Sequence, residues 1–182
     1  MTKYIALLRG INVGGNNIIK MADLKIAFEQ RGFQNVITYI NSGNIIFNSD
    51  LGEDTVKDIC EKLIAEDFGL DIPVCVISAF NLIDAMAHAP DWWGSDPESK
   101  HNALFVISPM TTKEVLTQIG AIKPEYERID YYGKVIFWSA PIATFSRTRL
   151  TKIVQSKAAY NAITIRNANT ARKLAKLTGE TE

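Results

Sequence analysis

The order of the expected strands and helices is the feature that most constrains what this chain can fold into. Runs of apolar and β-branched residues predict strands, and apolar residues at three- and four-residue spacing predict helices. Over about the first 78 residues the order is strand, helix, strand, strand, helix, strand. The expected ranges are 3–9, 21–31, 35–40, 45–48, 53–67 and 73–77.

The same order follows in the second half of the chain. The expected ranges are 102–107, a helix from the capping box at Thr111 to about residue 120, hairpin strands at 126–131 and 134–138, a helix over 143–157, a strand over 161–165 and a last helix over 169–178. We therefore predict an α+β fold of two tandem ferredoxin-like (βαββαβ) units with an additional C-terminal helix. The units are expected at residues 1–78 and 100–182, joined by a helix and loop at 79–99.

Length and composition exclude several classes of protein. A chain of 182 residues, 47% of them hydrophobic, can bury a core without covalent staples. Two cysteines, Cys60 and Cys75, are too few for a disulfide scaffold or a cysteine-built zinc site. No apolar run is long enough to span a membrane and no signal peptide is indicated, so we expect no membrane partner. Metal-ligand spacings are also absent, so we expect no metal and no cofactor.

Two polar loops are the strongest candidate for a ligand site. One loop, residues 9–20, follows the first expected strand. The other, residues 41–44, joins the second and third expected strands. In a ferredoxin-like unit these loops lie at the same edge of the sheet. The residues expected to bind a ligand there are Arg9, Asn12, Gly14, Gly15, Asn16, Asn17, Lys20, Asn41, Ser42 and Asn44.

The chemistry of these loops favours a small anion. Glycines let backbone amides approach a ligand, Asn side chains offer donors and acceptors, and the next helix begins with a positive dipole. Arg9 and Lys20 add full charges. The loop is not a P-loop, because Asn16 and Asn17 stand where that motif requires Lys and Ser or Thr. The alternative interpretation is that Gly and Asn only form turns.

Three segments resemble a known bacterial family. They are LLRGINVGGNNIIKMADLK, YINSGNIIF and ITIRNANTARKL, and they are similar to the domain of unknown function number 1697. The resemblance implies a small cytoplasmic protein with a two-unit ferredoxin-like fold, and it implies no reaction. Where this family usually has an aromatic residue near its C-terminal end, this chain has Ala168, which argues against a stacking role for that segment.

The C-terminal motif of the resemblance is a second candidate for anion binding. Arg166, Asn167, Asn169 and Thr170 lie at the expected start of the last helix, where backbone N–H groups lack partners. A phosphate or carboxylate would fit there, and the motif is expected to close the site formed by the two loops. A plain helix cap is the alternative interpretation.

The uneven distribution of charge leaves nucleic acid as an alternative partner. Residues 50–98 carry a net charge of −10, whereas residues 147–182 carry eight basic and two acidic side chains, a net charge of +6. Basic side chains contact a phosphate backbone without reading its sequence. The residues expected to do so are Arg147, Arg149, Lys152, Arg172 and Lys173.

A second alternative is an enzyme that acts on a phosphorylated substrate at the two loops. It lacks an evident general base, because residues 9–20 and 41–44 contain no His, Asp or Glu, and Asp23 is the nearest acid. The two histidines, His88 and His101, lie near the ends of expected elements and are interpreted as structural. The catalytic residues of such an enzyme are not assigned by the sequence.

Overall fold

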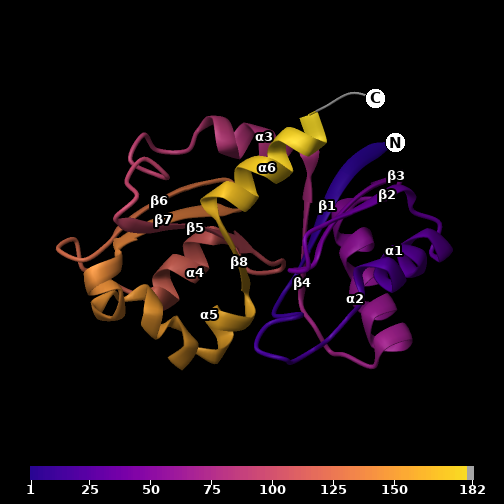
Figure 1. Ribbon diagram of the computed structural model, residues 1–182, viewed down its shortest axis with the longest axis horizontal. Coiled ribbons are helices and arrows are strands. Elements are labelled where there is room, and N and C mark those ends of the chain that lie inside the picture. The colour runs from indigo at the N-terminus through magenta and orange to yellow at the C-terminus, as the bar shows by residue number, and fades with distance from the viewer. Residues whose placement is uncertain (180–182) are drawn as a thin grey trace. The chain divides into compact units, whose positions relative to one another are not determined.

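The computed structural model describes residues 1–179, which form two compact units. Within the described residues, unit 1 comprises Met1–Leu82 together with residues 178 and 179, and unit 2 comprises Ile83–Leu177. Each unit contains one four-stranded antiparallel sheet with helices packed against it (Figure 1). The α+β fold class predicted from the sequence is therefore confirmed.

Unit 1 follows the predicted order of elements. Its sheet has the strand order β2-β3-β1-β4, and every neighbouring pair is antiparallel. The elements are β1 (Thr2–Leu8), α1 (Met21–Gln30), β2 (Gln34–Tyr39), β3 (Asn44–Ser49), α2 (Glu53–Phe68) and β4 (Val74–Ser78).

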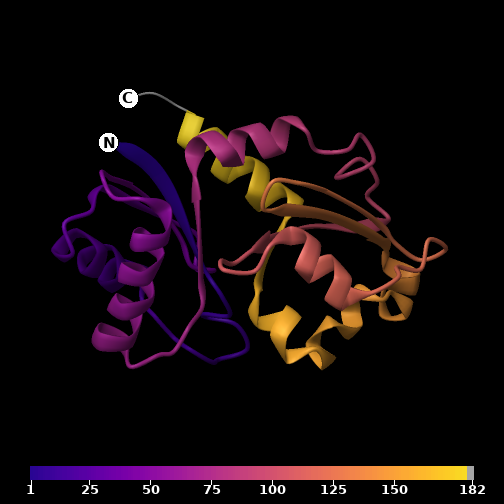
Figure 2. The ribbon, with the colours of Figure 1, turned by 180° about the vertical axis from the view of Figure 1, so that it is seen from behind.

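The core of unit 1 lies between its sheet and the helices α1 and α2, which cover one face of the sheet (Figure 2). Alternate β1 residues, Tyr4, Ala6 and Leu8, face this core. Phe28 on α1 packs edge-on against Phe47 on β3, with ring centroids 5.4 Å apart. This packing holds α1 against the sheet, and residues 9–20 connect the end of β1 to the first residue of α1.

Unit 2 repeats the strand order, as β6-β7-β5-β8, and again every pair is antiparallel. Helix α3 (Ala79–Ala87) leads into it, and Ser78 accepts a hydrogen bond from Asn81 N at the start of that helix, as expected. The elements of unit 2 are β5 (Ser99–Val106), α4 (Thr112–Ile119), β6 (Arg128–Tyr132), β7 (Val135–Pro141), the 3₁₀ segments η1 (Ile142–Arg147) and η2 (Leu150–Gln155), α5 (Lys157–Asn161), β8 (Ile163–Asn167) and α6 (Ala168–Gly179).

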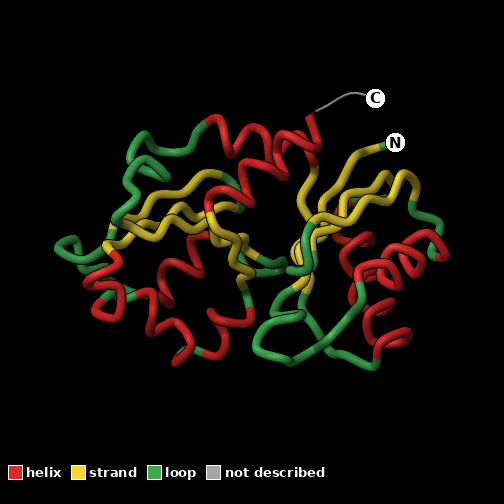
Figure 3. Tube along the Cα trace, viewed as in Figure 1, coloured by secondary structure: helices red, strands yellow, loops and turns green. Residues whose placement is uncertain are grey.

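Both faces of the unit 2 sheet are covered (Figure 3). On one face Ile136 and Trp138 pack against α4, η2 and α5. On the other face Trp93 packs edge-on against Phe137, with centroids 5.0 Å apart. Arg172 of α6 lies over the Trp93 ring and donates a 2.7 Å hydrogen bond to its carbonyl oxygen. The loop that carries Trp93 is thereby fixed against the sheet and α6.

The single helix predicted over 143–157 is wrong. That stretch forms η1, η2 and the short helix α5 instead. The carboxylate of the buried residue Glu127 accepts hydrogen bonds from Arg149 N at 2.7 Å and Leu150 N at 3.3 Å, so these amides are not available to a continuous helix. Leu150 is buried as expected. The capping box at Thr111 is confirmed, while the last predicted strand lies two residues later, in β8.

Candidate functional site

The two polar loops of unit 1 meet at one edge of its sheet, as the strand order requires. Asn12 joins them: its Nδ2 donates to Ile19 O at 2.9 Å and to Asn41 O at 2.8 Å, and its Oδ1 accepts from Ile19 N at 2.8 Å. We call residues 9–20 and 41–44 together the loop edge. One amide side chain thus fixes the position of both loops.

The centre of the first loop is a small hairpin. Val13 and Asn16 form a β-bridge, and Asn16 N donates to Val13 O at 3.1 Å. Gly14 and Gly15, with φ of 59° and 78°, are the two central residues, as a type I′ turn requires. Asn17 also has a positive φ, and its Nδ2 donates to Gly10 O at 3.1 Å. The backbone of the hairpin therefore accounts for much of the Gly and Asn content of this loop.

The second loop is shaped by Asn44 and Gly43. Asn44 is fully buried, and its Nδ2 donates to Tyr39 O and to Ser42 Oγ, both at 3.0 Å. Gly43 has a φ of 76°, and a Cβ there would lie 2.8 Å from the Cβ of Leu8. Asn44 therefore shapes the turn and is not exposed to a ligand, although the sequence pointed to it as a ligand residue.

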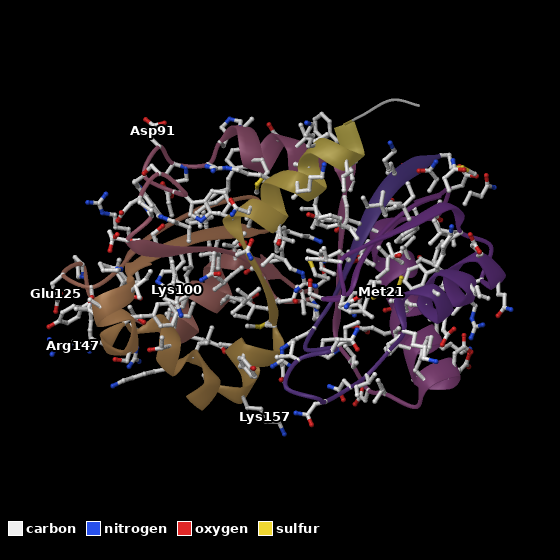
Figure 4. The ribbon with its side chains drawn as sticks, viewed as in Figure 1. Met21, Asp91, Lys100, Glu125, Arg147 and Lys157 are labelled. Carbon is white, nitrogen blue, oxygen red and sulfur yellow. The ribbon has the colours of Figure 1, made fainter. Side chains whose placement is uncertain are left out.

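Several groups at the loop edge still face solvent. The side chains of Asn16, Lys20 and Asn41 are exposed, and Arg9 is half-buried. Helix α1 begins here at Met21 (Figure 4), and its N-cap residue, Lys20, provides no side-chain hydrogen bond to the helix. The first amides of α1 thus lie beside a lysine at an edge whose loops are fixed.

The C-terminal motif lies in unit 2 and is built mainly as a helix cap. Asn167 Oδ1 accepts the N–H of Thr170 at 2.8 Å, which is the capping geometry expected from the sequence. Arg166 is buried and donates to Thr164 Oγ1 and to Ile165 O, both at 2.9 Å. Asn167 and Asn169 line a hollow of about 410 Å³ that His101 also lines. The loop edge and this motif belong to different units.

The basic residues proposed for nucleic acid do not form one patch. Arg149 donates from Nε to Ile119 O at 2.7 Å, on the face of the unit 2 sheet that α4 covers. Arg147 lies over the Tyr126 ring, with its Cζ 5.7 Å from the ring centroid; Figure 4 labels Arg147. Arg172 packs on Trp93, on the opposite face of the sheet. Lys152 and Lys173 are both exposed. Lys152 lies in η2, on the same side of the sheet as α4, whereas Lys173 lies in α6, the helix that carries Arg172.

A polar cluster that the sequence did not reveal surrounds His101. The ring contacts Ser139 Oγ through Nδ1 at 2.5 Å and Asp96 O through Nε2 at 2.6 Å. The pKa of Asp96 lies below its usual value, chiefly because its carboxylate accepts hydrogen bonds from the Ser99 hydroxyl and the Glu98 N–H. Because Ser139 is 38 residues from His101, only the strand register brings the two side chains together.

The remaining titratable groups indicate structural roles. His88 stacks on Tyr132 with centroids 4.0 Å apart, and the hydrogen bond from the Tyr132 hydroxyl to Asp84 raises the pKa of that tyrosine. Cys60 and Cys75 are buried, and burial raises the pKa of the Cys60 thiol. Within residues 1–179 no group of three or more His, Cys, Asp or Glu residues could hold a metal ion, and no helix there could span a membrane.

The fold and the loop edge define an α+β protein with two four-stranded antiparallel sheets and a polar edge on the first. The family described as "Protein of unknown function (DUF1697)" matches residues 1–137, and the chain belongs to this family, as its motifs predicted. The match includes the loop edge. The fold is similar to that of the conserved bacterial protein SP0830 from Streptococcus pneumoniae, at 30% identity and a TM-score of 0.85, over 97% of this chain and 98% of that chain. Comparison with curated proteins gives no match.

Proposed function

We propose that this chain binds a small ligand that carries a phosphate or carboxylate group, at the loop edge of unit 1. The observation that carries the proposal is the start of α1, where no side chain caps the helix and Lys20 is the last residue before it. The first backbone N–H groups of a helix have no intrahelical partner, and the helix dipole places a partial positive charge there. An anion satisfies both, and Lys20 adds a full charge.

The rigidity of the loop edge supports the same proposal. The Asn12 hydrogen bonds and the type I′ turn hold the loops in place without a ligand. A ligand therefore does not have to order them, which removes one of the usual entropic costs of binding. The exposed amides of Asn16 and Asn41 are available to orient the rest of the ligand. Arg9, half-buried at the end of β1, is the second cation of this edge.

We also propose that each unit is ferredoxin-like. The supporting observations are the antiparallel strand orders β2-β3-β1-β4 and β6-β7-β5-β8 and the element order β1-α1-β2-β3-α2-β4 of unit 1. In unit 2 the 3₁₀ segments and α5 take the place of the second helix. This topology explains why the β1–α1 loop and the β2–β3 turn share one edge.

The experiment is thermal unfolding against inorganic phosphate, sugar phosphates, nucleotides, carboxylates and short oligonucleotides. A ligand at 100 times its Kd adds about 2.7 kcal/mol of stability, which raises the Tm of a chain of this size by about 5–10 °C. Lys20→Ala is expected to weaken the binding of a small anion about 10- to 100-fold, because a hydrogen bond to a charged group contributes about 1.5–3 kcal/mol.

The matched control is Lys62→Ala. Lys62 is an exposed lysine on α2, and its Nζ lies 3.7 Å from Glu66 Oε1. Its replacement by Ala removes the same charge from unit 1, but at a position outside the loop edge. Normal binding by Lys20→Ala and Arg9→Ala would show that the anion site is elsewhere. A shift with oligonucleotides alone, lost on raising the salt concentration, would favour the basic C-terminal region instead.

A further inference from the structure

Three polar side chains form a row across the unit 2 sheet. Ser139 on β7 lies directly opposite Arg128 on β6 and opposite His101 on β5. Residues directly opposite one another in antiparallel strands point to the same face of the sheet. All three line one hollow of about 390 Å³. The sheet register thus places a serine between a histidine and an arginine at the wall of a cavity.

The hydrogen bonds of His101 define which nitrogen carries the proton. The carbonyl oxygen of Asp96 can only accept, so Nε2, 2.6 Å away, donates to it. In the neutral ring Nδ1 is then the acceptor, and it receives the hydroxyl hydrogen of Ser139 at 2.5 Å. A hydroxyl, a base within hydrogen-bond reach, and a third group that orients the base form the arrangement of an activated nucleophile.

The other hydroxyl next to the histidine is engaged differently. Ser99 also lines the hollow, but its hydroxyl donates to the carboxylate of Asp96 at 2.7 Å. Its proton therefore points away from the imidazole. Ser139 is the hydroxyl that the structure pairs with a base.

We propose that Ser139 is a nucleophile that hydrolyses small carboxylic esters in this hollow, with His101 as its general base. Ser139 Oγ forms a bond to the ester carbonyl carbon while its proton passes to His101 Nδ1. The bond from that carbon to the alcohol oxygen then breaks, and the departing alcohol takes the proton from His101. Water attacks the acylated serine, its proton passes through His101 to Ser139 Oγ, and the carboxylic acid leaves.

The lining of the hollow sets the class of substrate. A volume of about 390 Å³ is at the small end of ligand pockets. Trp92 and Tyr126 contribute aromatic residues to the lining. Arg128 also lines the hollow, and in the proposed reaction it is the cation that stabilises the negative charge formed on the carbonyl oxygen during attack. The acids Asp96, Glu125 and Glu127 also line the hollow and outnumber Arg128. This excess of negative charge disfavours anionic substrates, so an uncharged short-chain ester is favoured.

The test is covalent labelling of the intact protein with phenylmethylsulfonyl fluoride, followed by peptide mapping, together with hydrolysis of p-nitrophenyl acetate. We expect a single sulfonyl adduct on Ser139. Peptide mapping of the wild-type chain does not depend on whether any variant folds. His101→Gln keeps a polar side chain between Ser139 and Asp96 but removes the base, so labelling and hydrolysis are expected to slow at least ~100-fold.

Ser139→Ala should lose both the adduct and the hydrolysis. The control is Ser108→Ala, in the same unit, whose hydroxyl accepts a hydrogen bond from Lys134 and does not line the hollow. It is expected to label and hydrolyse as the wild type does. The absence of any adduct, an adduct on another residue, or equal labelling rates for wild type and His101→Gln would overturn the proposal. This site is in unit 2, so its failure would leave the anion site of unit 1 untouched.

Discussion

Replacement of Asn12 by Ala is expected to release the two loops of unit 1 from each other. The Asn12 side chain makes three hydrogen bonds, two with Ile19 and one with Asn41, at 2.8–2.9 Å. Ile19 is itself buried, so its N–H and carbonyl groups lose partners that water replaces only in part.

The magnitude follows from these contacts. At about 1 kcal/mol net for each hydrogen bond, the loss is about 2–3 kcal/mol. Asn12 also has a φ of 54°, a left-handed conformation that costs Ala about 1 kcal/mol more than it costs Gly. We therefore expect Asn12→Ala to destabilise by about 3–4 kcal/mol, and Asn12→Gly by about 1 kcal/mol less.

The assay is urea unfolding followed by far-ultraviolet circular dichroism, with Asn16→Ala as the control. Asn16 is an exposed Asn in the same hairpin, and its replacement should change the free energy of unfolding by less than about 0.5 kcal/mol. If Asn12→Ala were as stable as Asn16→Ala, the Asn12 network would not hold the loop edge, and the claim of a preformed anion site would fail with it.

Other substitutions test the packing around the two sites. Gly43→Ala places a Cβ 2.8 Å from the Cβ of Leu8 at a φ of 76°, so it should destabilise the protein by about 2–4 kcal/mol. Gly133→Ala, at a φ of 55° with open space around the new Cβ, should destabilise it by only about 1 kcal/mol. Chemical denaturation of both variants measures the difference. Glu127→Gln places an amide donor among four N–H donors and should destabilise by about 2–4 kcal/mol, and unchanged stability would contradict the role assigned to this carboxylate. Hydrogen bonds from Thr111 lower the pKa of Glu114 from 4.5, so the capping box stabilises the chain above that pH and loses its contribution as the pH falls through the lowered pKa; Glu114→Gln should flatten the acid side of a stability–pH profile.

The elements of unit 1 could be predicted because local signals agree there. Gly69 ends α2 in a left-handed conformation with φ 66°, and apolar spacing marks the buried faces of both helices. The meeting of the two loops also followed from element order alone, without any knowledge of contacts. The sequence overestimated the number of polar side chains at the loop edge that are available to a ligand. Asn12, Asn17 and Asn44 donate hydrogen bonds to backbone carbonyl groups, and composition does not reveal these bonds.

The errors in unit 2 come from contacts between residues far apart in the chain. The helix expected over 143–157 is interrupted because the carboxylate of Glu127, more than 20 residues earlier, binds the amides that would continue it. The pairing of His101 with Ser139 depends on the β5–β7 register, which no periodicity specifies. Period counting finds elements, but it does not find which side chains two distant strands bring together.

The distribution of tryptophan and cysteine between the units provides two spectroscopic reporters without any substitution. Trp92, Trp93 and Trp138 are all in unit 2, and both cysteines are buried in unit 1. Indole fluorescence therefore follows the unfolding of unit 2, while reaction of Cys60 and Cys75 with a thiol reagent follows the opening of unit 1. Recording both signals on the wild-type chain would show directly whether the two units unfold in one cooperative step or in two.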